Sequence, residues 1–165
     1  MALPRVIKNF NAFVDGVSYF GLCLTGTLPV PKIMTEAHRG SGMDGPVGID
    51  MGTEAMTASL TFAEHRPDLL RQLGRQGRFV MRPAQGSATD TGATAIIATI
   101  GGLITTAETG ELKPGTNSTL KLDMDVRYYR LEIDGAEVFE LDLVNAIRRV
   151  GGVDQLAEIR RAMGL

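Results

Sequence analysis

The sequence predicts a mainly β protein, an antiparallel β-sandwich or barrel with one short helix and a C-terminal helix. Apolar and polar residues alternate with a period of two over several stretches, as in strands with one buried face. Asp134-Gly135 separates two such stretches, which is the strongest short-range signal of a β-hairpin. Glycine accounts for 20 of 165 residues, as expected for a chain with many turns. The length is that of one domain, and residues 1–165 are interpreted as one.

The clearest single strand is predicted between Glu54 and Glu64. Its polar residues occupy the odd positions, and its even positions are apolar. This alternation is typical of a strand that packs one face on a core and exposes the other. The apolar set consists of Met56, Ala58, Leu60 and Phe62.

The longest predicted strand begins at Thr119 and ends before Asp134. Its apolar residues occupy even positions up to Tyr128 and odd positions from Leu131 onwards. A shift of one residue in a period-two pattern indicates a β-bulge. At about 15 residues the strand is roughly 50 Å long, so it must curve around a core or project beyond it. The chain is then predicted to return in a second strand over residues 136–144.

The remaining elements are predicted from weaker signals. Further strands are expected over residues 18–28, 32–37, 77–82 and 94–106, the last interrupted by Gly101-Gly102. Two segments rich in turn-forming residues, 38–52 and 85–92, are expected to lack regular structure.

Two helices are predicted. Pro67 suits the first turn of a short helix that runs to about Leu73. Asp154 is expected to cap a C-terminal helix. The apolar stripe of that helix predicts that Leu156 and Ile159 are buried.

Composition excludes several functional classes. The chain has 17 basic and 19 acidic residues and a formal charge of −2, so it lacks the basic excess of a nucleic-acid-binding protein. The single cysteine, Cys23, excludes an internal disulfide framework and a cysteine-rich zinc site. The first 20 residues do not have the apolar core of a signal peptide, and no stretch is long and apolar enough to span a membrane. We therefore expect a soluble intracellular protein with no membrane partner.

No group of residues predicts catalysis or a cofactor. The loop at residues 39–46 is rich in glycine but lacks the ending of a phosphate-binding loop. His65 is interpreted as a solvated histidine at a strand–helix junction. The acidic residues between Asp123 and Asp142 alternate with other residues along one face, which favours a solvated charged surface over a metal site. We expect no enzyme activity, no metal and no cofactor.

Short sequence matches to one known family occur in order along nearly the whole chain. They are Ala2–Arg5, Asp15-Gly16, Arg39–Val47, Ile49–Gly52, Leu112–Gly115, Tyr128–Leu131, Val144-Asn145, Gly152–Asp154 and Arg160–Leu165. In this order and spacing, the chain resembles the major tail tube proteins of contractile-tailed bacteriophages and of related contractile bacteriocins.

The resemblance implies a structural virion protein whose long strands close into a multi-subunit ring. Hexameric rings would stack into the inner tube of a contractile tail. That tube would house the tape measure protein and later conduct DNA without binding it specifically. The implied partners are further copies of the chain, the tail sheath protein, the tape measure protein, and the baseplate and tail terminator proteins. The implied location is the virion, with the host cytoplasm during assembly.

Two alternatives stay open from the sequence. One is the tube protein of a contractile bacteriocin or of a secretion system, which has the same architecture in another context. The other belongs to a different class, a small ligand-binding β-sandwich. Three Tyr, six Phe and no Trp offer few aromatic anchors for a ligand pocket, which disfavours this second alternative.

The candidate functional residues lie in three places. Glycine density between Arg39 and Gly52 predicts a loop that is mobile in one subunit and ordered by contact between rings. Asp123 and Asp125 are predicted to face the lumen, and Arg160 and Arg161 to contact a neighbouring subunit. The residues predicted to make the inter-ring contact are Arg39, Ser41, Met43, Asp44, Pro46, Ile49 and Asp50.

Overall fold

The computed structural model describes residues 3–89 and 91–165, and within them every strand pairing is antiparallel. The predicted mainly β class with two helices is therefore confirmed. The strands are β1 (Val6–Val14), β2 (Val17–Ser18), β3 (Cys23–Thr27), β4 (Ile33–His38), β5 (Val47–Thr53), β6 (Met56–Phe62), β7 (Gln76–Gly86), β8 (Ala93–Thr109), β9 (Leu120–Ile133), β10 (Ala136–Asp142), β11 (Ile147–Val150) and β12 (Val153–Asp154). The helices are α1 (Pro67–Leu70) and α2 (Ala157–Met163).

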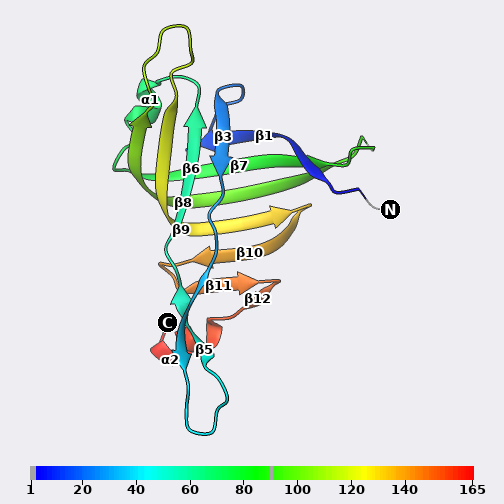
Figure 1. The fold of residues 1–165 in the computed structure, drawn as a ribbon, viewed down its shortest axis with the longest axis vertical. Coiled ribbons are helices and arrows are strands. Elements are labelled where there is room, and N and C mark those ends of the chain that lie inside the picture. Colours follow the sequence, from blue (N-terminus) through cyan, green and yellow to red (C-terminus); the bar gives the residue numbers. More distant parts are fainter. Residues whose placement is uncertain (1–2, 90) are drawn as a thin grey trace.

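The main sheet has ten strands and divides at β9 (Figure 1). One edge of β9 pairs with β8 along most of its length. The other edge pairs with β6 over residues 120–126 and with β10 over residues 128–133. As a result, β3, β6, β9, β8, β7 and β1 curve around one core, which we call the barrel. The strands β10, β11 and β12, which we call the sheet extension, continue away from the barrel toward α2.

The division coincides with the β-bulge that the sequence predicted. Gly101 lies opposite Tyr128 and Gly102 lies opposite Val126, so Arg127 is the extra residue of β9. Buried residues accordingly change from even to odd positions along the strand. Gly102 makes the bulge possible, since a Cβ atom there would lie 2.0 Å from the carbonyl oxygen of Asp125. The predicted bulge is thus confirmed.

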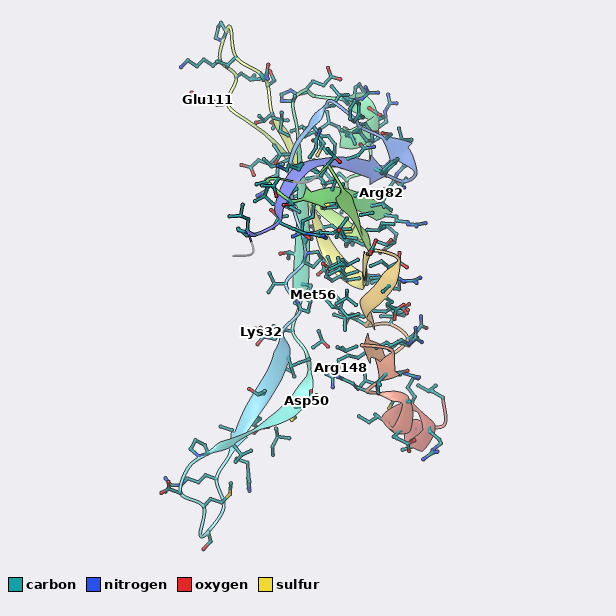
Figure 2. All side chains as sticks on the ribbon, turned by 90° about the vertical axis from the view of Figure 1, so that its right-hand side faces the viewer. Lys32, Asp50, Met56, Arg82, Glu111 and Arg148 are labelled. Carbon is teal, nitrogen blue, oxygen red and sulfur yellow. The ribbon has the colours of Figure 1, made fainter. Side chains whose placement is uncertain are left out.

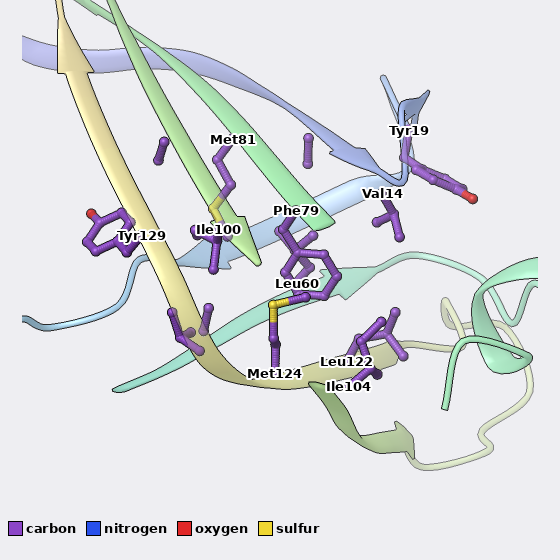
Figure 3. Close-up of a cluster of buried hydrophobic side chains, with 14 of the residues drawn as sticks. Val14, Tyr19, Leu60, Phe79, Met81, Ile100, Ile104, Leu122, Met124 and Tyr129 are labelled. Atoms are coloured by element: carbon purple, nitrogen blue, oxygen red, sulfur yellow. The ribbon is translucent and has the colours of Figure 1, made fainter. Parts of the chain in front are cut away.

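The core of the barrel is built from the alternating residues of these strands (Figure 3). Each fully buried large apolar side chain contributes about 1.5–3 kcal/mol relative to an exposed one. Leu69 of α1 is also buried, so this short helix packs on the core. On β6, the four residues predicted to face the core are all buried. They are Met56, Ala58, Leu60 and Phe62.

The hairpin between β9 and β10 turns at Asp134-Gly135, as predicted. Both residues have positive φ angles, of 53° and 77°, which a tight two-residue hairpin turn requires. Hydrogen bonding also makes β8 continuous from Ala93 to Thr109. The expectation that Gly101-Gly102 interrupts this strand was wrong, because pairing with β7 and β9 maintains the strand through both glycines.

Two other predictions about regular structure were wrong. Residues 38–52, expected to be irregular, contain the end of β4 and nearly all of β5, and these two strands pair with each other. The tertiary pairing supplies the backbone hydrogen bonds, so glycine content alone was misleading. Residues 18–28, expected to form one strand, divide into the end of β2 and β3, because a turn at Phe20–Leu22 includes Gly21 with a φ of 81°.

The strands β4 and β5 form a separate two-stranded sheet that projects from the barrel (Figure 1). We call residues 33–53 the arm. Its strands contain no buried residue. Because an isolated two-stranded hairpin is only marginally stable in water, the arm depends on further contacts to hold one orientation.

Replacing Gly102 by Ala should destabilise the subunit severely, because the new methyl group would overlap the backbone of β9. We expect the free energy of unfolding to fall by roughly 3 kcal/mol or more. Urea denaturation followed by circular dichroism measures the change. Gly101→Ala is the matched control, since its Cβ would meet only Tyr128 Cβ at 3.6 Å, an ordinary contact. Equal stability of the two variants would contradict the role assigned to Gly102.

Candidate assembly surfaces

The tip of the arm holds most of the predicted inter-ring contact residues. Its loop, residues 39–46, is folded by contacts of Met43. The Met43 backbone oxygen accepts a hydrogen bond from Arg39 Nε at 3.3 Å, and its sulfur accepts one from the Gly40 amide at 3.0 Å. Ser41, Asp44 and Pro46 are exposed. The structure thus gives Arg39 and Met43 a role inside the loop and leaves the other three side chains free to meet a partner.

Asp50 of β5 forms an ion pair with Arg148 of β11 (Figure 2). Arg148 Nη1 donates to Asp50 Oδ1 at 3.2 Å, and Nη2 donates to Oδ2. The Gly52 amide donates to the same carboxylate at 2.9 Å. These hydrogen bonds, led by that from Arg148, lower the pKa of Asp50. Asp50 was predicted to contact another ring, but in the subunit its carboxylate is already engaged.

The other side of the arm presents exposed apolar side chains together with Glu36 and His38. Side chains alternate along a strand, so Ile49 and Met51 lie on the face of β5 opposite Asp50. We call the exposed apolar side chains on this side of the two arm strands the arm stripe. Ile49 was predicted as a contact residue, and its exposure is compatible with that role. The arm stripe consists of Met34, Val47, Ile49 and Met51.

The face of β7, β8 and β9 that points away from the core forms a hollow of about 660 Å³. Its polar lining includes Arg78, Arg82, Thr99, Tyr128, Arg130 and Glu132. We call this surface the charged face. The sequence signal was the polar half of the alternating pattern in each strand. That signal could not show that the polar side chains of the three strands form one surface, because the register between the strands depends on tertiary pairing.

Ion pairs neutralise the β9–β11 side of the charged face. Arg130 pairs with Glu132 at 2.8 Å and with Glu137 at 3.3 Å, and Arg149 pairs with Glu140 at 2.6 Å. Arg78 and Arg82 form no ion pair with any described residue. The β7 side of this face therefore carries the uncompensated positive charge.

Asp123 and Asp125, the predicted lumen residues, lie outside the core but also outside the hollow. Both are on the part of β9 that pairs with β6, before the bulge. Asp123 is 3.6 Å from the ammonium group of Lys121, and Asp125 is exposed. The bulge separates these carboxylates from the charged side chains of the hollow.

The C-terminal helix does not bury its apolar side chains. The prediction that Leu156 and Ile159 are buried was wrong: Leu156 is half-buried and Ile159 is 54% exposed. The reason is that α2 follows the last short strand of the sheet extension, where no second layer covers it. Val153, Met163 and Leu165 are also exposed, so the helix and its flanks present apolar surface.

Arg160 and Arg161, the predicted subunit contacts, are both engaged within the chain. Arg160 donates to the Ala146 carbonyl at 2.7 Å and to Asp154 Oδ2 at 2.5 Å. The hydrogen bond from Arg160 is the largest cause that lowers the pKa of Asp154 to about 2. Arg161 pairs with Glu158. The Arg160 contacts attach the helix to the preceding turn and strand, whereas the Arg161–Glu158 pair lies within the helix.

One long edge of the sheet is open. β1 pairs with β7 on one side, whereas β2 covers the other side only at Phe13 and Val14. Val6 and Ile7, in the uncovered part, are exposed. An uncovered strand edge offers unpaired backbone groups to another chain. The opposite end of the sheet is the short strand β12.

Other candidate chemistry finds no support in the part of the chain described. Within residues 3–89 and 91–165, no cluster of three or more His, Cys, Asp or Glu side chains is arranged to hold a metal ion. No helix in these residues is long and apolar enough to cross a membrane. Burial raises the pKa of the Cys23 thiol to about 11, which disfavours the thiolate that a nucleophile needs.

The model of one protein family, phage tail tube protein FII, matches residues 4–164. The chain belongs to this family. It is 34% identical to the tail tube protein of Escherichia phage P2, with full coverage of both chains. It is 28% identical to the major tail tube protein of Serratia phage KSP20, over 100% of this chain and 99% of the relative. The predicted resemblance to tail tube proteins of contractile-tailed phages is confirmed.

A solved structure is also similar. A chain in the baseplate of the anti-feeding prophage matches with a TM-score of 0.48 and 13% identity, over 87% of this chain and 99% of that one. Because the chain belongs to a family of tail tube proteins, it is a structural virion protein and not an enzyme, as the sequence predicted.

The pKa of Asp154 should return toward its ordinary value of 3.8 when Arg160 is replaced by Met. A carboxylate with a lowered pKa stabilises the fold above the ordinary pKa, and that contribution disappears as the pH falls toward 2. The titration of Asp154 by NMR measures the shift. Arg161→Met is the control, because Arg161 pairs with Glu158 instead. An unchanged Asp154 pKa in Arg160→Met would refute the assignment.

Replacing Ile159 by Asp should leave the stability of the isolated subunit within about 0.5 kcal/mol of the parent, because the side chain is exposed. Leu60→Asp provides the comparison. It would bury a carboxylate in the barrel core and cost on the order of several kcal/mol. Thermal and urea denaturation of the monomer compare both with the parent. A large loss of stability in Ile159→Asp would show that the helix packs its apolar side internally.

Proposed function

We propose that this chain polymerises as stacked hexameric rings into the inner tube of a contractile tail. The observation that carries the proposal is the family match over nearly the whole chain. The open edge of β1 supports it, because such an edge must be covered by another chain to avoid unspecific pairing. The tube would house the tape measure protein and conduct DNA. Its other partners would be the tail sheath, baseplate and tail terminator proteins.

Lateral association would join the β1 edge of one subunit to the β11–β12 end of the next. These are different surfaces, so the contact is heterologous, and a heterologous contact repeated by rotation closes into a ring. Closure would remove the open edges, and the exposed side chains of Val6 and Ile7 would then contact the neighbouring subunit. The hexameric number comes from the family resemblance.

The charged face is our candidate for the lumen wall. It is hollowed and polar, and it lies on the side of the sheet away from the core. Asp123 and Asp125 remain predicted lumen residues on the continuation of β9. The formal charge of −2 per subunit would repel DNA overall, whereas Arg78 and Arg82 of the charged face would attract its phosphate groups locally during passage.

The tip of the arm is our candidate for contact between rings. Arg39, Ser41, Met43, Asp44 and Pro46 lie in its loop, and Ile49 and Asp50 lie on β5. The arm projects from the barrel, which gives it the reach to meet another subunit (Figure 1). Arg160 and Arg161 remain candidates for subunit contact through donors that their internal partners leave unused.

Assembly would take place in the host cytoplasm, and the tube would then be part of the virion. A bacteriocin or secretion-system tube is the alternative context, in which the same self-association would serve without a genome. The family match disfavours a ligand-binding β-sandwich.

Deleting Ser41–Pro46 should abolish tube formation while leaving a folded monomer, because the arm contributes no buried residue to the core. Circular dichroism tests the fold, and negative-stain electron microscopy with sedimentation tests assembly. A same-length Gly-Ser replacement separates the loss of side chains from shortening of the loop. Tubes of normal length from the deletion variant would refute the contact role.

A further inference from the structure

The arm is attached to the rest of the subunit at few points. Its base is closed by the Glu54 amide, which donates to the Lys32 carbonyl at 2.8 Å, and by a Lys32–Glu54 ion pair at 3.0 Å. These contacts join the two sides of the base to each other. A hollow of about 220 Å³ lies between the base, at Ile33 and Thr53, and the strands β10 and β11. Close packing therefore does not determine the direction of the arm.

Arg148, which lines this hollow, forms an ion pair with Asp50 of the arm. Among the described residues, this pair is the only hydrogen-bonded link between the arm and the remainder of the subunit. The guanidinium group is planar and meets both carboxylate oxygens. A two-point contact of this kind fixes the orientation of the two groups as well as their distance.

Arg148 is unusual in its surroundings. It is 6% exposed, and it is the one charged residue in the buried class among those described. It lies opposite Leu141 of β10, and Phe139 and Val150 line the same hollow. A buried charge in an apolar setting is unfavourable unless it is paired, so Arg148 depends strongly on Asp50. Pairing with this single partner on the arm indicates a positioning role.

Holding Asp50 also determines which side of the arm faces outward. Since Asp50 is turned toward β11, alternation along β5 turns Ile49 and Met51 away from it. The arm stripe is exposed on that outer side. An arm held in one direction has already lost the conformational freedom that binding would otherwise remove, which strengthens binding.

We propose that the Arg148–Asp50 ion pair is a latch that orients the arm in the free subunit, so that the arm stripe is presented to a second copy of this chain. Arg148 is a positioning residue, and the side chains of the arm stripe make the contact. The identity of the partner as a second copy rests on the proposed function. The orienting role of the latch concerns the single subunit and is tested separately.

The first measurement determines the direction of the arm by pulsed electron paramagnetic resonance. Nitroxide labels are attached through Ser41→Cys on the arm and Ala157→Cys on α2, in a Cys23→Ala background. Dilution with unlabelled chain restricts the signal to distances within one subunit. The parent should give one narrow distance distribution, whereas Asp50→Asn and Arg148→Met should each broaden it at least about twofold. Narrow distributions in both variants would overturn the latch.

Two comparisons keep this measurement interpretable. Asp44→Asn makes the same chemical change on the arm at an exposed residue that forms no ion pair with any described residue, and it should retain the narrow distribution. In Asp50→Asn, the buried charge of Arg148 loses its partner, which could disturb folding. Arg148→Met removes that charge, so the barrel of this variant should fold in either case. Circular dichroism confirms the fold of each variant. Broadening in Asp44→Asn equal to that in Asp50→Asn would also overturn the latch.

The second measurement is the protein concentration at which tubes form, followed by light scattering and electron microscopy. Arg148→Met should raise that concentration about tenfold, since an unrestrained arm must be ordered during assembly. An unchanged value, together with a broadened distance distribution, would overturn the link between latch and assembly. Failure of the parent chain to form tubes would refute the proposed function, while the distance measurement would still decide the latch.

Discussion

The pairing of β9 with β8 across the bulge at Arg127 is the constraint on which the other features depend. The bulge lets one strand serve two successive neighbours, β6 on the barrel side and β10 on the other. Without it, the alternation of Leu120–Val126 would continue unchanged, and Tyr129 would point away from the core. The absence of a side chain at Gly102 allows the two backbones to approach at this point.

From this division come two regions with different packing. The barrel encloses the apolar side chains of its core, with Leu60, Ile104 and Leu122 among those without exposed surface. The arm, the sheet extension and α2 have only one layer, and many of their apolar side chains remain exposed, whereas Leu141 of β10 is buried with the core. Exposed apolar surface of this extent is typical of proteins that associate. In a tail tube family member, the barrel thus supplies the stable unit and the single-layer parts supply surface for other chains.

Charged residues follow the same division. On the charged face and around α2, most of them are partnered within the chain, as in the Arg130–Glu132 and Arg160–Asp154 pairs. These half-buried pairs orient side chains and short elements within the chain. Arg148 differs because it is buried and its partner belongs to the arm. Its position links the orientation of a projecting element to the sheet extension.

The local sequence by itself determined those elements that follow from the alternation of apolar and polar residues or from turn-forming residues. The alternation of β6, the phase shift in β9 and the Asp134-Gly135 turn could all be predicted, because each depends on backbone geometry and on which face is buried.

The tertiary structure decided which neighbouring element each strand or helix meets. β5 exists because β4 lies beside it, although its sequence contains glycines that favour loops. An apolar stripe on α2 predicted burial, but burial needs a second layer, and the fold of one subunit does not provide it. The ion pair between Asp50 and Arg148 joins residues far apart in the chain, so only the folded arrangement of arm and sheet extension brings them together.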